Sequence, residues 1–261
     1  MSEPRVMVAP DPDRVPGTLR EELGCLPRHI AIVMDGNGRW ASQRRRPRSF
    51  GHRAGQKAVR AAVEFCLREG IQALTLFAFS SENWQRPASE IKALMELFLR
   101  ALDREIKSLL ENDVRLRFIG DLDSFDAPLR ERMARAQAVT AGSATLALNV
   151  AVSYGGRWDI AQACRQLAQQ VQAGRLTPDD IDEALIDSHL SLAGQPPLDL
   201  LIRTGGERRI SNFLLWQVAY AELYFTDTLW PDVDQAAMRA ACIDFAGRER
   251  RYGLTSEQVQ P

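Results

Sequence analysis

The sequence is poor in the side chains that bind soft metals or form disulfides. Its three histidines are far apart along the chain: His29, His52 and His189. Its four cysteines are scattered, with no CxxC spacing: Cys25, Cys66, Cys164 and Cys242. This pattern excludes a histidine-based metal site and a disulfide framework, so any metal should be a hard cation held by carboxylates. We predict that the cysteines are reduced core residues of a cytosolic protein.

The chain also lacks a strong net charge and a long apolar run. Its formal net charge is −1, which argues against a general nucleic-acid binder. No apolar stretch has transmembrane length, and no signal-peptide pattern is found at the N-terminus. We therefore predict a cytoplasmic protein that would meet any lipid substrate from the water side.

Apolar runs and helix-like segments alternate along the 261 residues. Strands are predicted near 30–34, 73–79, 114–119, 145–152, 198–202 and 221–225, and the main helices near 52–69, 89–111, 125–141 and 234–248. Alternation of this kind predicts an α/β fold: a single domain with a mainly parallel six-stranded sheet surrounded by helices. The expected divisions are a flexible N-terminal segment (1–24), the folded domain (25–252) and a C-terminal tail (253–261).

The stretch from Ile30 to Ala41 combines a buried strand with groups that bind charge. The strand ends at Asp35, and Gly36-Asn37-Gly38 then predicts a tight loop whose backbone N–H groups face a ligand. With the carboxylate and the nearby Arg39, the stretch favours a metal-bound phosphate or diphosphate. A plain turn is an alternative. The glycine spacing also fits a dinucleotide fingerprint, but the acidic residue that the fingerprint needs at the end of the next strand is missing.

Polar segments follow the first, second, fourth and fifth predicted strands. In a parallel sheet these segments meet at one edge, where such folds bind ligands. Five arginines are expected to converge there: Arg39, Arg48, Arg86, Arg203 and Arg209. Their mutual repulsion calls for a strongly anionic substrate. Asp35 and Glu222 are expected to reach the same edge as magnesium ligands, so the inventory fits two diphosphates and a metal better than one nucleotide.

The predicted helix at 89–111 has an unusually wide apolar face. Ten large apolar side chains make up this face: Ile91, Leu94, Met95, Leu97, Phe98, Leu99, Leu102, Ile106, Leu109 and Leu110. Core packing explains such a face, and so does one wall of an apolar tunnel. The sequence leaves both interpretations open.

At this point the residues resemble those of the cis-prenyltransferases. The resemblance is carried by HIAIVMDGNGRWA, FGHRAG, LTLFAFSSENWQRP, LNVAVSYGGRWDI and DLLIRTGGERRISNFLLWQVAYAELYFTDTLWPD. It runs from about residue 25 to residue 252 and is strongest toward bacterial members that make undecaprenyl diphosphate, a lipid carrier precursor for cell-wall polysaccharide synthesis. It implies a homodimer that condenses isopentenyl diphosphate repeatedly onto farnesyl diphosphate with Mg²⁺, forming cis double bonds. It also implies a hydrophobic tunnel and transient membrane contact for product release.

The resemblance also assigns roles to residues. Asp35 and Asn83 would be catalytic, and Asp35 and Glu222 would bind Mg²⁺. The allylic diphosphate would be held by Gly36, Asn37, Gly38, Arg39, Trp40, Arg48 and His52. The second motif would add Ser80, Ser81, Glu82, Trp84 and Arg86. Isopentenyl diphosphate would be held by Arg203, Arg209, Ile210 and Ser211, and Leu146 would limit product length at the closed end of the tunnel.

One of these roles conflicts with chemistry. A neutral amide is a very poor base, so we expect Asn83 to orient a diphosphate oxygen or a water that takes the proton. Two rival functions are an NAD- or nucleotide-binding α/β enzyme and a non-catalytic partner subunit. The second would be expected to lack parts of the catalytic set, which this chain retains.

Overall fold

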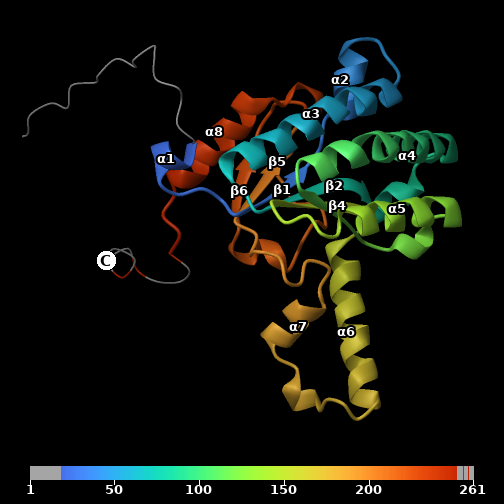
Figure 1. Ribbon diagram of the computed structural model, residues 1–261, viewed down its shortest axis with the longest axis vertical. Helices are drawn as coiled ribbons and strands as arrows, with labels where there is room; N and C mark the ends of the chain where they lie inside the picture. The colour runs from blue at the N-terminus through green and yellow to red at the C-terminus, as the bar shows by residue number, and fades with distance from the viewer. Residues whose placement is uncertain (1–18, 252–254, 256–257, 259–261) are drawn as a thin grey trace, which may run out of the picture.

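The computed structural model describes residues 19–251, together with residues 255 and 258 (Figure 1). Residues 1–18 and most of the predicted C-terminal tail lie outside the described residues. The described part forms one α/β domain around a single parallel sheet, as the sequence predicts.

The sheet has six strands in the order β3-β4-β2-β1-β5-β6, all parallel. Their bounds are β1 His29–Val33, β2 Ala73–Ser80, β3 Val114–Ile119, β4 Leu146–Tyr154, β5 Leu200–Arg203 and β6 Glu222–Phe225. The apolar runs form strands because helices cover both faces of the sheet, so side chains pointing either way are buried. All five residues of β1 are buried.

In the described part of the chain, eight α-helices connect and flank the strands. Their bounds are α1 Leu19–Leu23, α2 Asn37–Gln43, α3 Arg48–Glu69, α4 Ala88–Glu111, α5 Ala127–Thr140, α6 Gly156–Gln172, α7 Glu183–His189 and α8 Gln235–Ala246. Short 3₁₀ helices occupy Ser81–Gln85, Leu122–Ser124, Pro178–Asp180, Gln217–Tyr220 and Trp230–Asp232. In Figure 1, α6 and α7 (yellow and orange) extend away from the sheet.

The core lies on both faces of the sheet. On one face, Ile30 and Ile32 of β1 belong to a large apolar cluster that also takes residues from α3, α5 and α8. On the other face, Ala31 and Val33 join a smaller cluster with the segment after β5. The alternation follows from the two-residue period of a strand. The central strands are therefore held from both sides, and their carboxyl ends form a fixed edge.

Two sequence predictions about the periphery need correction. The predicted loose segment extends too far, because Leu19 is buried and its backbone N–H donates to the Glu69 carboxylate (2.7 Å). Among the cysteines, Cys66 and Cys242 are buried as predicted, whereas Cys25 and Cys164 are exposed. Among the described residues, no helix has the length and apolar character needed to cross a membrane.

Candidate active site

Asp35 lies just beyond the carboxyl end of β1, at the beginning of α2. Its Oδ1 accepts the Gly36 N–H (2.6 Å) and lies 3.3 Å from Arg39 Nη2, while its Oδ2 accepts from Arg203 Nη2 (2.9 Å). Burial acts to raise the pKa of Asp35, but the Arg203 hydrogen bond, the Gly36 N–H and the two guanidinium charges hold it below its usual value. The carboxylate is thus kept ionised.

The glycines around Asn37 differ from the predicted loop. Gly36 has φ +106° and precedes α2, while Gly38 lies inside that helix. A Cβ on Gly38 would lie 2.9 Å from Arg48 Nε, so glycine there admits the arginine. A short helix start, rather than an open loop, therefore follows Asp35.

Arg203, at the end of β5, is the most deeply placed cation of the site, with 4% of the residue exposed. Besides Asp35, its Nη1 donates to the Arg209 carbonyl oxygen (2.7 Å) and to Ser211 Oγ (2.7 Å). These bonds fix the segment between β5 and β6 against the Asp35 carboxylate. The Arg209 side chain itself is exposed and pairs with Glu207.

A second charged group lies where α3 and α4 begin. Glu90 pairs with Arg86 (3.3 Å) and with Arg48 (3.8 Å). Burial, with the nearby charges of Arg86 and Arg48, lowers the pKa of His52 to about 4. His52 is therefore neutral at pH 7 and lies in an environment that favours negative charge.

Three buried polar atoms at this edge have no hydrogen-bond partner within the described part of the chain: Asn37 Oδ1, His52 Nε2 and Arg203 Nε. Buried polar groups in folded proteins are normally satisfied by protein, water or ligand. All three residues line one cavity together with Asp35, where a bound ligand can satisfy these atoms.

The lowered pKa of His52 gives a testable pH dependence. Below pH 6.5 the His52 imidazole is protonated in the unfolded state, whereas in the folded state it stays neutral down to about pH 4. Stability should therefore fall across that window, by up to about 3 kcal/mol. We expect urea unfolding at pH 7 and pH 4.5 to show a larger loss for the wild type than for His52→Gln. Equal losses would contradict the buried, neutral imidazole.

The 3₁₀ helix Ser81–Gln85 follows β2. Asn83 Oδ1 accepts the Ser80 N–H (3.1 Å), and Glu82 accepts from Asn212 Nδ2 (2.7 Å). Trp84 instead donates to Ser153 Oγ (2.9 Å) and packs against Phe79 and Phe125. Ser80, Glu82, Asn83 and Arg86 face the cavity described next, whereas Trp84 supports them from behind.

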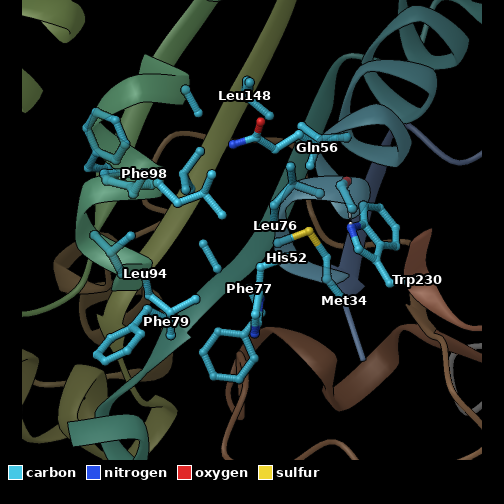
Figure 2. Close-up of a pocket in the computed structure, with 18 of the residues that line it drawn as sticks. Met34, His52, Gln56, Leu76, Phe77, Phe79, Leu94, Phe98, Leu148 and Trp230 are labelled. Carbon is cyan, nitrogen blue, oxygen red and sulfur yellow. Dashed lines mark hydrogen bonds between the residues drawn. The ribbon is translucent and has the colours of Figure 1, made fainter. Parts of the chain in front are cut away.

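A cavity of about 1250 Å³ opens at this edge and runs along the sheet. Its mouth is polar, with Asp35, His52, Arg86 and Arg203 among the lining residues. Farther in, the walls are apolar: Figure 2 shows Leu94 and Phe98 of α4 across from Leu76. The wide apolar face of α4 thus lines a cavity, and of its residues only Leu102 is buried.

Polar contacts close the cavity along the line where α3 meets α4. Arg60 Nε donates to Glu105 Oε2 (3.1 Å), and Arg104 Nη2 donates to Gln56 Oε1 (2.8 Å). All four side chains line the cavity, yet these contacts are exposed to solvent. We call this line of contacts the α3–α4 seam.

Glu222 does not reach the edge that the sequence predicted. It is the first residue of β6 and pairs in register with Leu200, which in turn pairs with Ile30. Ile30 precedes Asp35 by five residues, which corresponds to roughly 16 Å at the rise of a β-strand. Glu222 is therefore displaced from Asp35 by about that distance along the strand direction. The Glu222 carboxylate pairs with Arg248 instead (2.8 Å). Within one chain, the expected Asp35–Glu222 pair is therefore wrong.

Leu146, the first residue of β4, is fully buried and lies outside the cavity lining found among the described residues. Its register partner on β3, Val114, lines the inner end. We expect Leu146→Ala to destabilise the fold by about 2–5 kcal/mol, and to shift product length less than Val114→Ala does. Denaturant unfolding and chromatographic sizing of the products would check both. A larger length shift for Leu146→Ala would contradict this placement.

The other predicted residues divide between mouth and periphery. Trp40 stacks on Phe50, and its indole N–H donates to Asp232 Oδ1 (2.6 Å). Ser81 Oγ donates to Glu82. Ile210 packs in the smaller apolar cluster. Of the five arginines, Arg86 and Arg203 line the cavity, while Arg39 pairs with Asp35 and Arg48 with Glu90. Arg209 contributes its carbonyl oxygen to Arg203, and its side chain pairs with Glu207.

Two site residues were missed from the sequence. Arg157, in the first turn of α6, lines the mouth. Asn212 also lines it, and its Oδ1 accepts the Arg157 N–H (2.9 Å). The sequence did contain a signal that Arg157 belongs to the site, because Arg157 directly follows the glycines at the end of the fourth predicted strand. Nothing local in the sequence predicts that the loop after β5 folds over to reach it.

The donor set at Asp35 fits a hard cation. No group of three or more His, Cys, Asp and Glu side chains that could hold a metal occurs within the described ranges. Mg²⁺ commonly binds through one or two carboxylates completed by water and substrate phosphates. One ionised carboxylate beside an anion-binding mouth satisfies that requirement.

Fold and site together define a class of protein: an α/β binding protein for an amphipathic ligand, with a cationic mouth for its charged head and an apolar cavity for its tail. The prenyltransferase family model described as undecaprenyl diphosphate synthase matches residues 33–253. The chain belongs to this family, the cis-prenyltransferases.

The relatives agree in length as well as in sequence. The ditrans,polycis-undecaprenyl-diphosphate synthase ((2E,6E)-farnesyl-diphosphate specific) of Xanthomonas oryzae pv. oryzae is 62% identical, over 90% of this chain and 91% of that protein. The protein of the same name from Escherichia coli K12 is 60% identical, over 89% and 91%. Lavandulyl diphosphate synthase from Lavandula x intermedia, solved in complex with dimethylallyl diphosphate, superposes with TM-score 0.85 and 35% identity, covering 89% of this chain and 99% of that one.

Proposed function

We propose that the protein condenses isopentenyl diphosphate repeatedly onto farnesyl diphosphate, forming cis double bonds and releasing undecaprenyl diphosphate, a carrier precursor for bacterial cell-wall polysaccharides. The observation that carries the proposal is one continuous cavity with Asp35 and the buried Arg203 at its mouth and apolar walls within. A cytoplasmic homodimer is part of the same proposal.

The allylic diphosphate is assigned to the start of α2 and α3. His52 presents an unpartnered Nε2 there, and Arg39 and Arg48 add positive charge. The farnesyl tail then enters between α4 and the sheet, where Leu76, Leu94 and Phe98 exclude water. Removing that apolar tail from water supplies much of the binding free energy.

Isopentenyl diphosphate is assigned to the segment fixed by Arg203. The guanidinium of Arg203 already holds Ser211 and the Arg209 carbonyl in place, so the Ser211 side chain and nearby cations are preorganised before a substrate arrives. Preorganised donors stabilise developing charge without reorganisation during the reaction. Holding the alkene beside the allylic carbon converts a bimolecular step into an effectively unimolecular one.

The condensation breaks the allylic C–O bond, and its electron pair leaves with the diphosphate. The alkene electrons of isopentenyl diphosphate form the new C–C bond, and a proton is then lost from C2 to restore a double bond. A magnesium ion held at Asp35 would neutralise part of the charge on the diphosphates. Arg39 and Arg203, both near Asp35, stabilise the departing anion in the same way. Glu222 could approach such a site only from a second copy of the chain.

Asn83 is assigned a positioning role by its hydrogen bonds. Its carbonyl oxygen is occupied by the Ser80 N–H, so the group left for a ligand is the NH₂, which donates. A donor can orient a diphosphate oxygen or a water but cannot accept the proton.

Asn83→Asp should therefore lower turnover by about 10²-fold, because an acceptor replaces the donor while the bond to Ser80 is kept. The measurement is turnover against pH with labelled isopentenyl diphosphate. Full activity that follows an ordinary carboxylate pH profile would rule out the positioning role.

Incubation of the protein with radiolabelled isopentenyl diphosphate, farnesyl diphosphate and Mg²⁺ tests the function as a whole. Products sized by chromatography should form a ladder ending near eleven isoprene units. No incorporation, together with a tryptophan fluorescence change on adding NAD(H), would favour the nucleotide-binding rival instead.

A further inference from the structure

Charge is strongly segregated along the chain. Residues 36–63 contain eight basic residues and no acidic residue, although the whole protein has a formal net charge of only −1. The remainder of the chain is therefore acidic on balance. A protein with such an asymmetric charge distribution turns its basic side toward an anionic surface.

Only part of this basic stretch forms ion pairs around the cavity, at its mouth or in the α3–α4 seam. Arg39 pairs with Asp35, Arg48 with Glu90, and Arg60 with Glu105. The others point to solvent from the α2–α3 connection and the outer face of α3. Four of these have no ion-pair partner within the described residues: Arg45, Arg46, Arg53 and Lys57.

Aromatic rings are interleaved with these cations. The Arg44 guanidinium lies 3.8 Å from the centre of the Trp40 ring, Trp40 stacks on Phe50 at 5.9 Å, and Arg46 lies 5.5 Å from the Phe50 ring. Phe50 is 39% exposed, and all nine residues from 42 to 50 are exposed. Phe50, Arg53 and Lys57 follow the spacing of one helix face. We call the group of Arg44, Arg45, Arg46, Phe50, Arg53 and Lys57 the basic–aromatic face.

We infer that the basic–aromatic face docks the protein on an anionic phospholipid bilayer. Arginine and lysine attract anionic headgroups, and an exposed aromatic ring inserts at the level of the headgroups. The inference rests on the proposed function, because the product's long hydrocarbon chain has to reach a membrane from a protein in which no described helix crosses one.

The position of the face suits delivery from the cavity. α2 begins beside Asp35 at the mouth and ends at Gln43, next to Arg44. Seven helical residues span only about 10 Å. A bilayer touching the basic–aromatic face therefore lies close to the cavity mouth.

Sedimentation of the full-length protein with vesicles tests the inference. We expect binding to vesicles containing phosphatidylglycerol, little binding to pure phosphatidylcholine, and loss of binding at high salt. The triple variant Arg45→Glu/Arg46→Glu/Arg53→Glu should bind at least tenfold more weakly. The matched control Arg135→Glu/Arg165→Glu/Arg175→Glu, which makes the same charge change at exposed positions of α5, α6 and beyond, should stay within about twofold of the wild type.

Activity measurements separate this inference from the proposed function. In detergent, the face variant should incorporate isopentenyl diphosphate at the wild-type rate, because none of its changed residues lines the cavity. On phosphatidylglycerol vesicles without detergent, its turnover should fall. If the wild-type protein made no product in detergent, the proposed function would be refuted. Vesicle binding could still be measured in that case, so the docking inference is tested separately.

Three results would overturn the docking face: no vesicle binding at low salt, equal losses for the face and control variants, or tighter binding of the face to an oligonucleotide than to vesicles. Unchanged thermal unfolding of both triple variants would show that the comparison reports on binding rather than on folding.

Discussion

Asp35→Ala is expected to lower turnover of isopentenyl diphosphate by at least about 10²–10³-fold, the cost of removing one electrostatic stabiliser. The carboxylate is ionised because Arg203, the Gly36 N–H and Arg39 all favour its charged form. Its loss would remove the proposed cation ligand and leave the buried Arg203 guanidinium without its counter-charge. Both effects weaken binding of the diphosphates in the orientation that reacts.

Asp35→Asn separates charge from shape, since an amide oxygen can still accept from Arg203. We expect it to fold as the wild type does and to lose nearly as much turnover as the alanine variant. Asp121→Asn is the matched control, because Asp121 follows β3 at the same edge of the sheet but does not line the cavity. Single-turnover and steady-state assays on all three would settle the role. Near-normal turnover of Asp35→Asn would remove the charge from the mechanism.

Val150→Trp is expected to shorten the products and to lower the yield of the longest chain at least about tenfold. Val150 lies midway along β4, in register with Leu76 and Phe118, and all three line the cavity. An indole there would fill space that the growing chain needs. Because the ring enters an existing cavity of about 1250 Å³, the overpacking cost of a filled core is avoided.

The control for this change is Val139→Trp, since Val139 is exposed on α5. It should leave the product ladder unchanged. Thin-layer chromatography of dephosphorylated products gives the chain lengths, and initial rates with the first isopentenyl unit show whether chemistry at the mouth survives. An unaltered ladder for Val150→Trp would mean that the hydrocarbon chain grows somewhere else.

The sequence predicted the sheet and the edge at which the site lies, because a parallel sheet brings every strand's carboxyl end to one side. Asp35, Asn83, Arg86 and Arg203 come together for that reason. Glu222 was misplaced because it is the first rather than the last residue of a four-residue strand. The predicted strand at 221–225 already placed Glu222 near its beginning, and in a parallel sheet that end lies at the edge opposite the carboxyl ends.

Other features depend on tertiary structure that the sequence does not encode locally. The apolar face of α4 has the same periodicity whether it packs on the core or borders a cavity, and only the placement of α4 relative to the sheet and α3 decides. The exposure of Cys25 and Cys164 likewise depends on what packs beside them. Arg157 and Asn212 meet because two segments far apart in sequence fold over the same mouth.

The α3–α4 seam is the part of the cavity wall that separates most easily. The solvent-exposed Arg60–Glu105 ion pair contributes only about 0–1 kcal/mol. Gln56–Arg104 is a single exposed hydrogen bond, so the two contacts resist separation weakly. The sheet opposite is tied by continuous backbone ladders and cannot give way. A growing hydrocarbon chain would therefore push α4 outward, and the cavity would widen as each isoprene unit is added.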